Sequence, residues 1–131
     1  MKTFIPLVLA AFIFVISAPI AFGQKATSIN FPRGTHETVV TGKLNGYASS
    51  KTYVIRVGKN QTITTEDVGK NPISLTIIGP KGSNYEQEMA ADCHSRNEIT
   101  PTVAGTYRIT VTQCTKADEW KGTFKFKITA K

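Results

Sequence analysis

The sequence has little of the chemistry that enzymes use. Its 131 residues include only two histidines, His36 and His94. It has no glycine-rich phosphate loop and no G-x-S-x-G motif, the local signatures of phosphate binding and of serine hydrolases. Acidic residues are also few, nine against sixteen Lys and Arg, and pairs such as Asp118-Glu119 are neighbours in the chain. Glycosidase chemistry needs two carboxylates that face each other across a cleft. We therefore expect a protein that is not an enzyme.

Metal ligands and cysteines are equally scarce. The run Asp92-Cys93-His94 is the one tempting metal site, but it lacks the paired ligand spacings of zinc sites. We expect no metal and no cofactor. An exported protein with two cysteines usually pairs them, so we expect a Cys93–Cys114 disulfide, with a catalytic thiol beside His94 as the alternative. The disulfide closes a loop of about twenty residues and contributes about 3 kcal/mol to stability.

Long apolar stretches occur only at the N-terminus. Lys2 is followed by an apolar segment of about fourteen residues, and small residues stand at Ala21 and Gly23, a pattern typical of a secretory signal peptide. We expect a signal peptide over residues 1–23, cleaved after Gly23. The alternative, a membrane anchor, needs a longer apolar run. The expected product is a single exported domain of residues 24–131 without stable membrane insertion.

The rest of the chain alternates apolar and polar residues with a period of two. In "KTYVIRV", for example, Tyr53, Ile55 and Val57 share one face, which is typical of a half-buried strand. No window of twelve residues shows a helical face, and turn signals separate the strands. The expected fold is an all-β antiparallel sandwich, jelly-roll-like, with about seven or eight strands. Residues 83–98 break the rhythm and are predicted to cross the surface. The predicted strands are 36–44, 51–57, 61–66, 73–79, 106–113 and 122–130.

The chain is basic, with a formal net charge of +7. Its lysines and arginines are spread along the sequence, which favours anionic partners or simply provides solubility. Binding of single-stranded nucleic acid needs exposed aromatic rings among the positive charges. Here Phe124 and Phe126 alternate with Lys125 and Lys127, so a strand places the rings and the charges on opposite faces. We therefore expect no nucleic-acid partner.

Several motifs along the exported part resemble a known type of bacterial sandwich. Their order is similar to the pre-peptidase C-terminal domain type and, within it, to the periplasmic inhibitors of g-type lysozyme. The resemblance extends over nearly the whole of residues 24–131. The most telling motif is Gly46-Tyr47, because Tyr47 falls in a loop where no core contact requires an aromatic residue. The matching motifs are F-x-x-G at Phe31–Gly34, G-x-L-x-G-Y at Gly42–Tyr47, Tyr53, the turn at Gly58, Gly79-Pro80, and G-x-Y-x-I-x-V at Gly105–Val111.

The resemblance implies a function by occlusion in the periplasm. In that family, loops at one end of the sandwich enter the cleft of a lysozyme, and a tyrosine meets the acidic groove. Tyr47 matches this tyrosine, and Lys116 is the nearest cation in the late loop. The loop at Ala104 and Gly105 is a further contact candidate, with Ala104 in the place of a serine in related inhibitors.

Two aromatic residues near these loops need an assignment. Tyr107 has the parity of Ile109 and Val111, so we expect a core or corner position for it. Trp120 is either an exposed interface residue or a cap that folds back on the sandwich, and the sequence leaves both open.

The predicted function is inhibition of a lysozyme, g-type first, by loops that contain Tyr47, Ala104, Gly105, Lys116 and Trp120. The alternative is an exported module of the cell envelope that binds carbohydrate or protein and inhibits nothing. The oligomeric state is not determined by the sequence.

Overall fold

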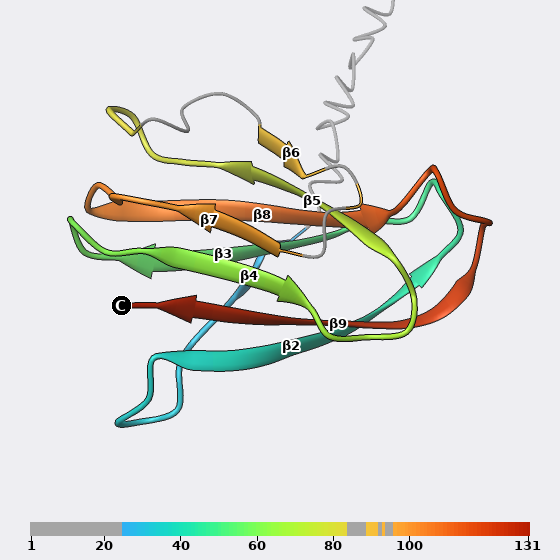
Figure 1. The fold of residues 1–131 in the computed structure, drawn as a ribbon, viewed down its shortest axis with the longest axis horizontal. Coiled ribbons are helices and arrows are strands. Elements are labelled where there is room, and N and C mark those ends of the chain that lie inside the picture. Colours follow the sequence, from blue (N-terminus) through green and yellow to red (C-terminus); the bar gives the residue numbers. More distant parts are fainter. Residues whose placement is uncertain (1–24, 84–88, 92, 94–95) are drawn as a thin grey trace, which may run out of the picture.

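Nine strands in two sheets make up the computed structural model, which describes residues 25–83, 89–91, 93 and 96–131 (Figure 1). The predicted signal peptide, residues 1–23, lies outside the described residues. No helix long and apolar enough to cross a lipid bilayer occurs in the described part of the chain. The strands are β1 (Thr27–Ser28), β2 (Glu37–Asn45), β3 (Lys51–Val57), β4 (Ile63–Asp67), β5 (Ile73–Ile78), β6 (Met89–Ala91), β7 (Arg96–Ile99), β8 (Gly105–Gln113) and β9 (Lys121–Ala130).

The strand order is that of a jelly roll. One sheet has the order β2-β9-β4-β7, and the other has the order β1-β3-β8-β5-β6. Without β1, these are the two four-stranded sheets that two Greek keys produce in an eight-stranded jelly roll. The predicted all-β sandwich is therefore confirmed. Strand β1 is an addition at the edge, where it pairs in parallel with β3, and two residues are too few to show any alternation in the sequence.

The core lies between the sheets and follows the period-two pattern. Strand β9 has the clearest alternation, with Phe124, Phe126 and Ile128 fully buried and Lys125 exposed. The rings of Phe124 and Phe126 stack with centroids 6.3 Å apart. Gly42 permits this packing, because a Cβ there would lie 2.4 Å from Cζ of Phe124. The side chains that meet across the sheets are Val40, Leu44, Tyr53, Ile55, Val57, Ile63, Ile73, Leu75, Ile77, Ile99, Tyr107, Ile109, Val111, Phe124, Phe126, Ile128 and Ala130.

The prediction for residues 83–98 was wrong in part, because this segment contributes two edge strands. Strand β6 pairs with β5, and β7 pairs with β4. Each is an edge strand of only three or four residues, which is too short for a period-two pattern to stand out in the sequence. The disulfide is confirmed: Cys93 and Cys114 are bonded, with their Cα atoms 5.2 Å apart. Asp92 and His94, the other residues of the tempting metal run, lie outside the described residues.

The core assignment of Tyr107 is confirmed. Its side chain is fully buried, and its hydroxyl oxygen accepts a hydrogen bond of 3.2 Å from the backbone N–H of Val103. This tie to the backbone four residues upstream fixes the loop that precedes β8, as in the tyrosine corner of other sandwiches.

Tyr107→Phe is expected to lower the free energy of unfolding by about 1–2 kcal/mol, because the N–H of Val103 loses its acceptor. Urea denaturation of the variant and the parent measures the change. Tyr47→Phe is the matched control, because it removes a tyrosine hydroxyl that bonds a backbone carbonyl at an exposed position. Equal losses of stability in the two variants would contradict a special role for the buried hydroxyl.

Candidate functional site

The predicted contact residues lie at two opposite ends of the sandwich. Tyr47 is in the turn between β2 and β3, and Lys116 and Trp120 are in the loop between β8 and β9, at the right-hand end of Figure 1. Ala104 and Gly105 lie where β8 begins, at the other end. Strands β3 and β8 run antiparallel between these ends, and seven residues of strand span about 20 Å. The structure therefore brings Tyr47, Lys116 and Trp120 together and leaves Ala104 and Gly105 apart.

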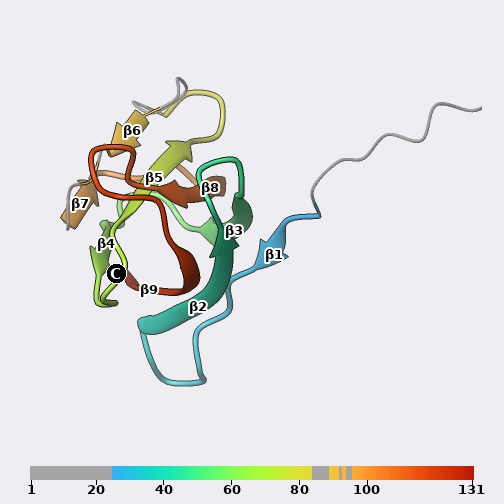
Figure 2. The ribbon, with the colours of Figure 1, turned by 90° about the vertical axis from the view of Figure 1, so that its right-hand side faces the viewer.

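Tyr47 is exposed but held in place. Its side chain is 41% exposed, and its hydroxyl donates a 2.5 Å hydrogen bond to the carbonyl oxygen of Ala117. Its backbone N–H donates to Oε2 of Glu119 at 3.3 Å, and the N–H of Gly46 donates to the carbonyl oxygen of Trp120 at 3.0 Å. Figure 2 looks onto this end and shows the two loops side by side. Residues about seventy positions apart in the chain thus form one surface, which we call the Tyr47 end.

Trp120 folds back onto the sandwich. The side chain is partly buried against the core, and its indole N–H donates to the carbonyl oxygen of Pro72 at 3.1 Å. Its backbone is clamped by Gln113: the N–H donates to Oε1 at 3.0 Å, and the carbonyl oxygen accepts from Nε2. Trp120 is therefore a cap that folds back on the sandwich, and not a fully exposed interface residue. A contact of Trp120 with a partner stays a prediction. The hydrogen bonds of Trp120 to Pro72 and Gln113 hold the β8–β9 loop against the sandwich.

The charge at the Tyr47 end is mixed. Lys116, Asp118 and Glu119 are all exposed in the β8–β9 loop. The loop starts at Cys114, which is buried and joined to Cys93 by the disulfide. The shape of the loop is therefore fixed at its base by the disulfide and at its far side by the contacts of Tyr47 and Trp120. Shape and the tyrosine ring, more than net charge, distinguish this surface.

The opposite end, around Ala104, is held by one buried threonine. Thr102 is 2% exposed, and its hydroxyl accepts from the N–H of Gln61 at 2.9 Å and donates to the carbonyl oxygen of Gly58 at 2.7 Å. These bonds join the β3–β4 loop to the β7–β8 loop. Between them lies a hollow with a volume of about 450 Å³. Its lining residues are Lys59, Asn60, Gly82, Pro101, Thr102, Val103 and Ala104.

The sequence places Thr102 in the same loop as Ala104, but it did not identify Lys59 as a neighbour of this loop. The turn at Gly58-Lys59-Asn60 is visible in the sequence, but nothing local indicates that it bonds to a threonine more than forty residues away. Within residues 25–83, 89–91, 93 and 96–131, no three side chains of the His, Cys, Asp or Glu type gather to hold a metal ion.

Comparisons with known proteins support the fold. No protein-family model matches the chain, and no curated protein matches it. Among solved structures, a periplasmic lysozyme inhibitor of g-type lysozyme from Aeromonas hydrophila, PliG, is similar with a TM-score of 0.66 and 17% identity. That match covers 81% of this chain and 96% of the inhibitor. PliG from Salmonella Typhimurium matches with a TM-score of 0.58 and 17% identity, over 82% of this chain and 98% of that one.

A second kind of protein has the same architecture. The pre-peptidase C-terminal domain of a collagenase from Bacillus anthracis matches with a TM-score of 0.50 and 18% identity, over 83% of this chain and 97% of that domain. The expected resemblance is therefore confirmed at the level of the fold: the chain has the sandwich that the periplasmic inhibitors of g-type lysozyme share with the pre-peptidase C-terminal domain.

Proposed function

We propose that the chain is an exported inhibitor of lysozyme, with g-type lysozyme as its first target, and that the Tyr47 end occludes the substrate cleft. The observation that carries this proposal is the exposed ring of Tyr47, fixed in position by its hydrogen bond to Ala117 in the neighbouring loop. The likeness to PliG structures supports it at the level of the fold.

The physics of such an interface favours a fixed aromatic residue. A few buried residues, tyrosine among them, carry most of the binding energy of protein interfaces. Ordering a free side chain on binding costs about 0.5–1.5 kcal/mol, and a ring that is already fixed avoids much of that cost. Lys116 is exposed in the same surface and is the group there that attracts the carboxylates of a lysozyme cleft, whereas Asp118 and Glu119 in the same loop oppose it. The disulfide supports an oxidising compartment such as the periplasm.

The experiment is a titration of the exported protein against goose-type, chicken-type and invertebrate-type lysozymes, with the rate of cell lysis as the readout. We expect the goose-type enzyme to be slowed at the lowest inhibitor concentration. Unchanged lysis rates with all three enzymes at micromolar protein would reject the inhibitor proposal.

A second candidate function rests on the hollow beside Ala104. An envelope module that binds carbohydrate or protein without inhibiting any enzyme would use this end, where the bonds of Thr102 fix both loops and an exposed Lys59 lies at the rim. The two candidates therefore place the contact at opposite ends of the sandwich.

Single charge removals at the two ends separate these candidates. Lys116→Gln is expected to weaken lysozyme inhibition about threefold to tenfold at low salt, mainly through a slower association rate, because the lysine attracts an acidic cleft. The difference should shrink at 0.5 M salt, where charges are screened. Surface plasmon resonance gives both rates.

The matched control is Lys59→Gln, which removes the same charge at the opposite end and is expected to leave inhibition unchanged. A larger loss with Lys59→Gln than with Lys116→Gln would mean that the Ala104 end docks instead.

A further inference from the structure

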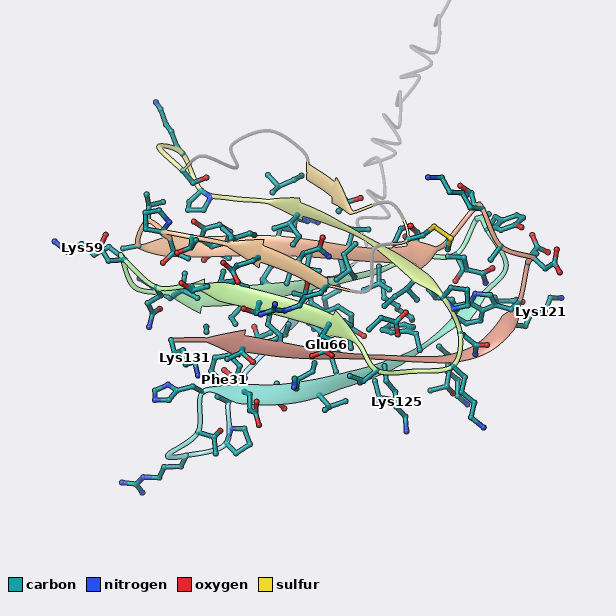
Figure 3. The ribbon with its side chains drawn as sticks, viewed as in Figure 1. Phe31, Lys59, Glu66, Lys121, Lys125 and Lys131 are labelled. Atoms are coloured by element: carbon teal, nitrogen blue, oxygen red, sulfur yellow. A yellow bond between two sulfur atoms is a disulfide. The ribbon has the colours of Figure 1, made fainter. Side chains whose placement is uncertain are left out.

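A separate hollow lies on the outer face of the sheet β2-β9-β4-β7. It has a volume of about 370 Å³, within the range of about 300–1,000 Å³ of small-molecule sites. The loop between β4 and β5 forms one wall and strand β9 forms the other. Figure 3 shows Lys125 on this face, pointing away from the sandwich. The hollow, which we call the Lys125 hollow, is lined by Val68, Gly69, Lys70, Asn71, Thr123 and Lys125.

Hydrogen bonds to β9 fix the loop wall. The N–H of Val68 donates to the carbonyl oxygen of Lys125 at 3.1 Å, and Nδ2 of Asn71 donates to the carbonyl oxygen of Thr123 at 2.9 Å. Gly69 lies against the strand, because a Cβ at this position would be 3.0 Å from the backbone nitrogen of Lys125. The loop wall of the hollow is therefore in place before any ligand binds.

Two ammonium groups flank the hollow from different segments. Lys70 in the loop and Lys125 in β9 are exposed, and among the described residues neither has a carboxylate within salt-bridge distance. Lys43 lies opposite Thr123 in the register of β2 and β9, and Lys121 is two residues before Thr123 on the same face. The field of four lysines raises the local concentration of anions.

The nearby carboxylates do not cancel this charge. Glu66 is already paired with Lys127 at 3.5 Å. Oδ1 of Asp67 accepts a hydrogen bond of 3.0 Å from the backbone N–H of Gly69, so this carboxylate stabilises the loop between β4 and β5. Burial raises the pKa of Asp67, while hydrogen bonds from the N–H groups of Gly69 and Ile73 lower it in part. An anion in the hollow therefore meets the lysines without a free carboxylate between them in the described part of the chain.

The other lining groups indicate what carries the anion. Asn71 and Thr123 offer an amide and a hydroxyl, and Val68, 46% exposed, offers an apolar edge beside them. Hydroxyl groups and a C–H face next to a charge are the features of an acidic sugar. We propose that the Lys125 hollow binds an acidic saccharide, with its oxyanion between Lys70 and Lys125 and its sugar ring against Val68, Asn71 and Thr123. This site is separate from Tyr47 and does not depend on lysozyme inhibition.

The test titrates the isotope-labelled exported protein with two acidic saccharides, trigalacturonate for a carboxylate and mannose 6-phosphate for a phosphate, and follows the amide signals by NMR. We expect shifts confined to residues 68–71 and 123–125, and the stronger of the two probes identifies the oxyanion. The methyl ester of trigalacturonate, which keeps the sugar and loses the charge, should bind at least tenfold more weakly.

Matched pairs of variants complete the test. Lys70→Gln with Lys125→Gln is expected to raise the dissociation constant about tenfold or more, while leaving lysozyme inhibition within twofold of the parent. Lys51→Gln with Lys59→Gln removes the same charge elsewhere and should change binding less than twofold.

Three results would overturn the proposal. The first is the absence of shifts with either saccharide at millimolar concentration, and the second is an equal loss in the two pairs of variants. The third is a response of the same amides to a short polyglutamate peptide alone, which would assign the hollow to acidic protein segments.

Discussion

Tyr47→Ala is expected to weaken lysozyme inhibition about thirtyfold or more. Removal of a central interface tyrosine costs about 2 kcal/mol or more, and 1.4 kcal/mol corresponds to a factor of ten in affinity. The ring is 41% exposed in the free protein, so it has surface left to bury against a partner. The measurement is the inhibition constant obtained from lysis rates over a range of inhibitor concentrations.

Two controls separate the contact from the stability of the loop. Tyr47→Phe keeps the ring and removes only the hydrogen bond to Ala117, so inhibition should fall no more than about fivefold. Val39→Ala truncates another exposed apolar side chain, 51% exposed on β2, and should have no effect. A Tyr47→Ala protein that inhibits as well as the parent would refute the proposed contact.

Removal of the disulfide is expected to produce the largest loss of stability. In Cys93→Ala with Cys114→Ala, the unfolded chain regains the freedom of a loop whose ends are 21 residues apart, which corresponds to about 3 kcal/mol. For a domain of this size, that lowers Tm by roughly 10–20 °C. Differential scanning calorimetry under non-oxidising conditions measures the shift.

The effect of the same variant on inhibition should be small below its Tm. The β8–β9 loop keeps the hydrogen bonds of Tyr47, Gln113 and Trp120 when the disulfide is absent. Reduction of the parent protein with dithiothreitol should reproduce the lower Tm. A Tm within 2 °C of the parent would mean that the crosslink adds nothing to the sheet pairing around it.

The sequence by itself determined the class of the fold and most of its core. Alternation in β3, β8 and β9 predicts which side chains face inward, because successive residues of a strand point to opposite faces whatever the strand pairs with. Tyr53, Tyr107 and Phe126 are buried as that rule requires. The disulfide was also predictable, because two cysteines in a chain that is expected to be exported leave only one pairing.

The tertiary structure alone decided which loops meet. Five predicted contact residues look equivalent in the sequence, yet the jelly-roll order places Tyr47 beside Lys116 and Trp120 and puts Ala104 at the other end. Strands β6 and β7 and the Lys125 hollow were likewise invisible, because each depends on pairing with a distant strand. Local periodicity determines the face on which a side chain lies, whereas sheet order determines its neighbours, and a binding surface is made of neighbours.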